Sequence, residues 1–184
     1  MAFGIELFFD LPTEKFLRKL GRRLEDKGVP SLFSISGGEP HVALAVFEKG
    51  NLPAIKESIK KLAARFSPFE LRLSSAGSFP GREGVLFLAP VVTFSLLEIH
   101  RRVHEFLGKS AAGSRDYYKP SWWVPHCTLG LKLSPAQLAK GFSHVKKTKF
   151  GKVGRYTRLG LVEVIEGRSL RIRPLFTIPL KPKK

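Results

Sequence analysis

The spacing of apolar side chains alternates between two periods, one typical of strands and one typical of helices. Alternating or continuous short apolar runs predict seven strands, at 3–9, 41–47, 69–74, 84–88, 126–133, around 157–165 and around 170–178. Apolar residues three and four positions apart predict four helices, at 12–28, 51–66, 93–107 and from Ser134-Pro135 onward. Serine is a favourable N-cap and proline suits the first helical turn, so the last helix has a clear start. Residues 29–39 and 108–125 are predicted as loops.

One five-residue phrase occurs twice. Pro40-His41-Val42-Ala43-Leu44 returns as Pro125-His126-Cys127-Thr128-Leu129, with the two histidines 85 positions apart. Each copy lies on a predicted strand that a helix follows. The chain has only five histidines among 184 residues, so the repetition indicates an internal duplication of a β-α-β unit. We expect an α+β fold with repeats at roughly 1–92 and 93–184, joined as one bilobal domain that spans 1–184.

The second copy places an imidazole beside a hydroxyl. Alternate residues of a strand point to the same face, so His126 and Thr128 project together while Cys127 points away. An imidazole moves protons, and a hydroxyl can hold a phosphate oxygen. His41 projects with Ala43, so the first copy has an imidazole without a hydroxyl. If the duplicated strands lie together, two imidazoles face one cleft.

The charge of the chain favours a polyanionic partner. The formal net charge is +17, and it is uneven: residues 1–92 carry 13 Lys and Arg against 10 Asp and Glu, whereas residues 93–184 carry 19 against 5. A surface this basic favours RNA or a nucleotide, because each neutralised phosphate releases counterions. A second interpretation is a solvated basic face. Both remain open for the basic run Lys146, Lys147, Lys149, Lys152, Arg155 and Arg158.

Several other classes of protein fit poorly. The longest apolar run, Val85–Val92, contains Pro90 and is far shorter than the ~18 residues of a membrane span, so no membrane association is expected. Acidic residues and the lack of a basic leader near the N-terminus do not resemble a signal peptide. A single cysteine, Cys127, suits a reducing compartment, and we expect a cytoplasmic protein. His100 and His104 have the spacing of a zinc pair, but without a third ligand a helix flank bordering the core is the better interpretation.

These residues resemble the 2H phosphoesterase superfamily, which includes 2′-5′ RNA ligase-like proteins and RNA 2′,3′-cyclic phosphodiesterases. The resemblance is carried by the two histidine phrases, by the aromatic and proline-rich approach at 118–125, and by the strand–helix order. It implies two mainly antiparallel sheets that form a central cleft, with helices outside. This chain departs from the pattern at Ala43, where the family has Thr or Ser.

The resemblance implies a metal-independent RNA phosphodiesterase, also assayable as a 2′-5′ RNA ligase, that acts on 2′,3′-cyclic phosphates or 2′-5′ linkages. His41 and His126 would be the general acid and base, in an order that the sequence leaves open, and Thr128 would bind the phosphate. Candidate substrate contacts are Arg82, Tyr118, Lys119 and Trp123. No cofactor or metal is expected, and a monomer is expected. The alternative is an RNA- or nucleotide-binding module of the same fold, with catalysis weakened or lost because of Ala43.

Overall fold

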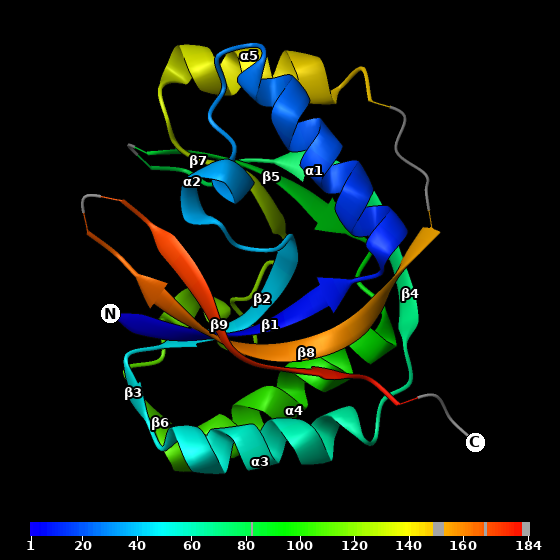
Figure 1. Cartoon of the computed structure of the whole chain (residues 1–184), viewed down its shortest axis with the longest axis vertical. Coiled ribbons are helices and arrows are strands. Elements are labelled where there is room, and N and C mark those ends of the chain that lie inside the picture. The colour runs from blue at the N-terminus through cyan, green and yellow to red at the C-terminus, as the bar shows by residue number, and fades with distance from the viewer. Residues whose placement is uncertain (82, 149–152, 168, 182–184) are drawn as a thin grey trace.

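The computed structural model describes residues 1–81, 83–148, 153–167 and 169–181. Its principal strands and helices follow the predicted order (Figure 1). They are β1 (Ala2–Phe9), α1 (Leu11–Glu25), α2 (Leu32–Ser36), β2 (His41–Phe47), α3 (Leu52–Ala63), β4 (Phe69–Gly77), β5 (Gly84–Pro90), α4 (Phe94–Ser110), β7 (Cys127–Leu133), α5 (Pro135–Val145), β8 (Val153–Ile165) and β9 (Arg171–Pro179). Two short strands, β3 (Lys49–Gly50) and β6 (Ala111–Ala112), pair with each other, and a 3₁₀ turn, η1, spans Asp116–Tyr118. The α+β prediction is confirmed.

Local chemistry explains where the helices begin. The side chain of Asp10 accepts a hydrogen bond from the backbone N–H of Thr13 at 3.0 Å, so α1 starts one residue before the predicted Pro12. Ser134 and Gln137 form a reciprocal capping box at the start of α5. The five-residue α2 was not predicted, because its 29–39 segment is too short to show a helical period. None of the helices in the described ranges combines the length and apolarity needed to cross a membrane.

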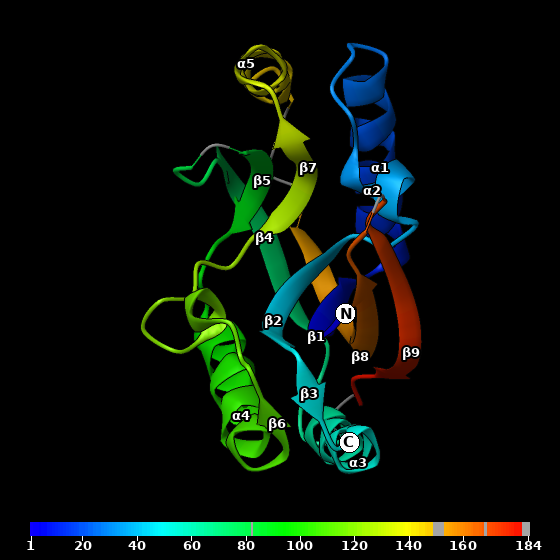
Figure 2. The ribbon, with the colours of Figure 1, turned by 90° about the vertical axis from the view of Figure 1, so that its left-hand side faces the viewer.

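The strands form one bent antiparallel sheet in the order β2-β1-β8-β4-β5-β7, with β9 paired to β8. Strand β4 belongs to both ends of this sheet: Phe69–Arg72 pair with β8, and the segment from Leu73 to Gly77 pairs with β5. The two sheets expected from the sequence are therefore joined through β4. This double pairing also explains why β4 is longer than predicted. Helices α1 and α5 lie at one end of the molecule and α3 and α4 at the other (Figures 1 and 2).

The two expected repeats, 1–92 and 93–184, do not form separate parts of the sheet. β1 from the first half of the chain pairs with β8 from the second half, and β5 from the first half pairs with β7 from the second. Each end of the sheet is thus built from both repeats. β2 and β7, the strands of the two histidine phrases, form opposite edges of the sheet, and the bend brings them into contact (Figure 2).

Candidate functional site

The two repeated histidines make the same hydrogen bond. Nδ1 of His41 lies 2.8 Å from the carbonyl oxygen of Glu39, and Nδ1 of His126 lies 2.7 Å from that of Val124. A carbonyl can only accept, so Nδ1 is the protonated donor in both rings, and Nε2 is the nitrogen available for chemistry. In each phrase the acceptor lies two residues before the histidine and directly before a proline. Proline holds the preceding residue in an extended conformation, which gives both carbonyls the same relation to the ring.

The fold brings the two imidazoles into one region. The indole Nε1–H of Trp123, just before the second phrase, donates to the carbonyl oxygen of Ala43 in the first, at 3.0 Å. Burial lowers the pKa of His126, and the charge of His41 lowers it further, against the opposing effect of the Val124 carbonyl. The strands of the two histidine phrases, β2 and β7, are in contact, which places both rings in the same part of the molecule. Two residues 85 positions apart thus share one electrostatic environment.

Two aromatic rings pack against the imidazole of His126. The Phe79 ring meets it edge-on with the centroids 4.9 Å apart, and the Phe87 ring lies at 5.2 Å. Phe87 is paired across the strands with Thr128, the half-buried hydroxyl residue of the second phrase. Gly77 makes room for Phe87, because a Cβ there would lie 2.5 Å from the phenyl ring. The sequence analysis missed both phenylalanines, since their relation to His126 depends on the pairing of β5 with β7.

A second row of side chains crosses the sheet at His41. Phe8 is paired with His41 on one side and with Arg158 on the other. The guanidinium of Arg158 lies 5.1 Å from the centre of the Phe8 ring and donates to the carboxylate of Glu39 at 2.7 Å. Arg158 belongs to the predicted basic run, and the fold places it two strands from His41. Lys149 and Lys152 of that run lie outside the described residues.

A buried carboxyl group, which the sequence analysis missed, faces the first histidine. Oε1 of Glu6 lies 3.2 Å from Nε2 of His41, and the Glu6 side chain is 3% exposed. Burial raises the pKa of Glu6 well above its ordinary value, and the nearby charge of Glu39 raises it further. Burial also lowers the pKa of His41, although the Glu39 carbonyl and carboxylate oppose this effect. Both shifts favour the neutral forms of the two groups. A glutamate within the apolar run of β1 was the available signal, because charged residues are rarely buried without a partner.

The candidate substrate contacts differ in burial and in the partners of their side chains. Trp123 stacks on His100 with the ring centroids 3.9 Å apart, in addition to its bond to Ala43. Tyr118 is half-buried, and burial raises the pKa of its hydroxyl. Lys119 is exposed and forms an ion pair with Asp116 at 2.6 Å. Arg82 lies outside the described residues.

His100 and His104 each have a backbone partner. Nε2 of His100 lies 2.8 Å from the carbonyl oxygen of Tyr118, and Nε2 of His104 lies 3.1 Å from that of Leu44. Across the described ranges, no three His, Cys, Asp or Glu side chains are grouped closely enough to hold a metal ion. The two histidines of α4 thus fasten the 115–125 segment and β2 to the helix.

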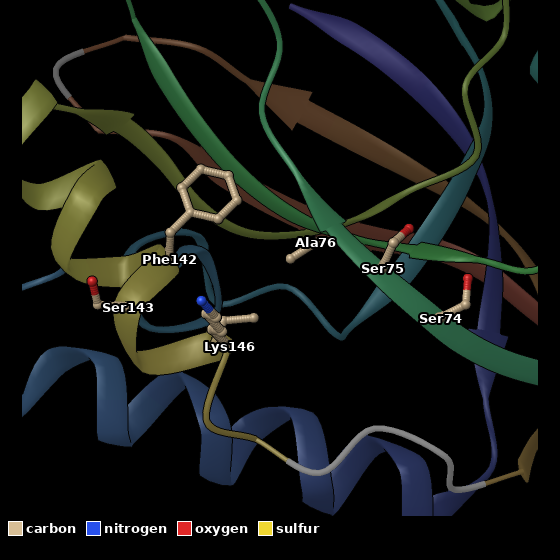
Figure 3. Close-up of a pocket in the computed structure, with 7 residues that line it drawn as sticks. Ser74, Ser75, Ala76, Phe142, Ser143 and Lys146 are labelled. Atoms are coloured by element: carbon tan, nitrogen blue, oxygen red, sulfur yellow. The ribbon is translucent and has the colours of Figure 1, made fainter.

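A separate cavity of about 430 Å³ lies between β4 and α5 (Figure 3). It is lined by Ser74, Ser75 and Ala76 from β4, and by Phe142, Ser143, Val145 and Lys146 from α5 and its C-cap. Ala76 is paired with Leu88, whose side chain points away from the face that carries Phe87. The cavity is therefore separated from His126 by the sheet, and it contains none of the predicted site residues.

The chain is similar to known proteins over most of its length. Residues 11–168 match the model of the 2′-5′ RNA ligase superfamily. One relative is a protein of Geobacillus thermodenitrificans that is provisionally named a phosphoesterase. The two sequences are 24% identical over 181 residues, which cover 97% of this chain and 96% of that protein.

Two solved structures share the fold. Escherichia coli LigT complexed with 3′-AMP superposes with a TM-score of 0.64 at 15% identity, over 97% of this chain and 96% of LigT. Thermus thermophilus TT0787 gives 0.63 at 18% identity over the whole of both chains.

Proposed function

We propose that this chain, which belongs to the 2′-5′ RNA ligase superfamily, is a metal-independent RNA phosphodiesterase that acts on 2′,3′-cyclic phosphates or 2′-5′ linkages. The observation that carries the proposal is the matched pair of Nδ1 hydrogen bonds. It makes Nε2 the nitrogen that can exchange a proton in both His41 and His126, and in this structure Nε2 of His41 faces the carboxyl of Glu6. Two histidines with the same hydrogen-bond geometry suit a reaction in which one group accepts a proton and another donates one.

In the proposed hydrolysis, each imidazole moves one proton. One neutral imidazole takes a proton from water through Nε2 as the water oxygen bonds to phosphorus. The other imidazole, protonated at Nε2, gives its proton to the ribose oxygen as the bond from phosphorus to that oxygen breaks. Acid–base assistance of this kind contributes roughly 10²–10⁴-fold for each group. The ligation direction exchanges the two roles, and Thr128 would donate its hydroxyl hydrogen to a phosphate oxygen that does not react.

The charge of the chain and its structural relatives support a nucleotide or RNA partner. The net charge is +17, and the excess lies in the second half. LigT has been solved with 3′-AMP, with ATP, with NADP⁺ and with phosphate. We extend nucleotide binding to this chain on the basis of the shared fold and the basic surface.

A second function is favoured by Ala43. This residue is 9% exposed and has no hydroxyl to contribute, so the first phrase provides only half of the expected phosphate contacts. A binding module with weak catalysis would then bind RNA with a steep dependence on salt, since phosphate contacts release counterions.

The deciding experiment incubates the protein with an oligonucleotide that ends in a 2′,3′-cyclic phosphate, in the presence of EDTA. We expect turnover that falls about 100-fold or more in His41→Ala and in His126→Ala. His144→Ala, a histidine on α5, is the matched control and should retain activity. Turnover that survives both site substitutions would refute the mechanism. Salt-sensitive binding without turnover on cyclic or 2′-5′ substrates would favour the binding module.

A further inference from the structure

An arginine of β8 lies on the same face of the sheet as His41. Phe8 on β1 is the register partner of His41 on β2 and of Arg158 on β8, and register partners of neighbouring strands project on the same face. The Phe8 ring meets the imidazole of His41 edge-on, with the centroids 6.4 Å apart, and the Arg158 guanidinium lies 5.1 Å from the centre of the same ring. One phenyl ring therefore separates the imidazole from the guanidinium.

Glu39 links the positions of the two groups. Its backbone carbonyl accepts a hydrogen bond from Nδ1 of His41 at 2.8 Å, and its carboxylate accepts one from Nη2 of Arg158 at 2.7 Å. The guanidinium also lies over the Phe8 ring, within the range of a cation–π contact. A guanidinium that is held by a carboxylate and by an aromatic face has few other positions to adopt. Its place relative to the imidazole is therefore set before a ligand arrives.

Most of the hydrogen-bonding capacity of Arg158 is unused. A guanidinium has five N–H donors, and among the described residues only Nη2 of Arg158 has a hydrogen-bond partner. The side chain is 31% exposed, so a ligand can reach it from solvent. Two N–H groups of an arginine match two oxygens of a phosphate and form strong charge-assisted bonds. The contact with Glu39 therefore orients the guanidinium and leaves Nε and Nη1 free to donate.

The adjacent row of side chains on this face offers an anion little else. Ala43 is paired with Glu6, and Glu6 is paired with Gly160. Ala43 and Gly160 have no polar side-chain atom, and the carboxyl of Glu6 already contacts Nε2 of His41. In the two described rows that cross β2, β1 and β8, Arg158 is thus the side chain with free donors for an anion.

A second arginine–glutamate pair on the same two strands provides a contrast. Nε and Nη2 of Arg173 on β9 both donate to Oε2 of Glu163 on β8. Glu163 lies five residues after Arg158 along β8, whose pairing with β1 is regular over this stretch, so the two side chains project on opposite faces. The Arg173 pair therefore has the same chemistry but lies on the face away from His41.

We propose that Arg158 forms a second anion subsite, which binds the phosphate one ribose away from the phosphate that reacts. The inference rests on the proposed function and narrows its substrate class to RNA ends that carry a 5′-phosphate or an internucleotide phosphate on the terminal nucleoside.

The geometry suits two neighbouring phosphates of one strand. Consecutive phosphates of RNA are separated by one ribose, and the guanidinium is separated from the imidazole of His41 by the ring of Phe8. The phosphate does not have to displace Glu39, because Glu39 occupies Nη2 alone. Arg158 makes no bond to the reacting phosphorus, so its effect is on the choice of substrate.

The test compares kcat/KM for two substrates that differ in one group, adenosine 2′,3′-cyclic phosphate and its 5′-phosphorylated form. We expect the wild type to prefer the 5′-phosphorylated form by about tenfold or more, the size of a charge-assisted contact. In Arg158→Gln the ratio of the two values should fall to about one. Arg173→Gln is the matched control, because it removes one arginine from the same strand pair, and it should keep the wild-type ratio.

Two results would overturn the subsite. One is a wild type that does not distinguish the two substrates. The other is an Arg158→Gln variant that loses rate equally on both and keeps the wild-type ratio, since Arg158 would then act only by holding Glu39 beside His41.

A binding measurement separates this inference from the proposed function. Calorimetry with adenosine 3′-phosphate and adenosine 3′,5′-bisphosphate needs no turnover. We expect the wild type and Arg173→Gln to bind the bisphosphate about tenfold more tightly, and Arg158→Gln to bind the two ligands equally. If the wild type turns over no cyclic phosphate, the proposed function fails and the difference in affinity still decides whether the subsite exists. Equal affinities in the wild type, or a difference that survives in Arg158→Gln, would refute it.

Discussion

The indole Nε1–H of Trp123 donates to the carbonyl oxygen of Ala43 at 3.0 Å, so the approach to the second histidine phrase is fastened to the middle of the first. These two residues lie 80 positions apart in the chain. The bond joins β2, at one edge of the sheet, to the segment that leads into β7, at the other edge. Substitutions around this junction therefore affect both stability and the geometry of the site.

Trp123→Phe should destabilise the protein by about 1 kcal/mol, because a partly buried carbonyl loses its donor while the ring still stacks on His100. The free energy of unfolding in urea measures this loss. Trp122→Phe is the matched control, since Trp122 is 76% exposed, and it should stay within about 0.5 kcal/mol of the wild type. Equal effects at the two positions would show that the bond contributes nothing.

Ala43→Thr should be unfavourable while Glu6 is present. The larger side chain enters space that the Glu6 carboxyl occupies, and such overpacking typically costs about 1–3 kcal/mol. In combination with Glu6→Val the loss should shrink, so the two changes should be non-additive by about 0.5–3 kcal/mol in unfolding free energy. Strict additivity in this double-mutant cycle would mean that the two side chains do not compete for space.

Gly77→Ala should disturb the aromatic wall of His126. The added Cβ would lie 2.5 Å from the Phe87 ring, which is packed between Phe79 and the imidazole. We expect a loss of about 1–3 kcal/mol in unfolding free energy, together with lower turnover. Gly108→Ala in α4 meets no atom within 4 Å and should stabilise the protein by about 0.5–1 kcal/mol through helix propensity. Stabilisation by both changes would contradict the proposed packing.

The stability of the protein should fall in mild acid because of His100. Burial, as the largest cause, lowers the pKa of His100 from 6.5 to about 4. In the unfolded chain this ring takes up a proton below pH 6.5, whereas in the folded chain it does so only near pH 4, so its contribution to stability is lost as the pH falls through this window. The maximum slope for one group is about 1.4 kcal/mol per pH unit. Melting temperatures of the wild type and of His100→Gln between pH 7.5 and 4.5 measure the effect. A decline of the same steepness in both proteins would assign it to other groups.

The sequence predicted the order of elements and the family correctly, since both depend on local signals. The apolar periods, the Ser134 cap and the two histidine phrases can be read without knowing which strands pair. Side-chain contacts that depend on which strands pair could not be predicted from the sequence. Glu6 meets His41 only because of the register and bulge between β1 and β2, and Phe87 meets His126 only because β5 pairs with β7.

The pairing of strands from the two halves of the chain also constrains how the chain folds. β1 pairs with β8 from Ala2↔Val164 onward, so the second residue of the protein finds its partner more than 160 positions later. A nascent chain that has emerged only as far as β5 contains β1 without its partner β8, and β5 without its partner β7. Because contacts between distant parts of the chain slow folding, we expect the pairing of β1 with β8 to form late.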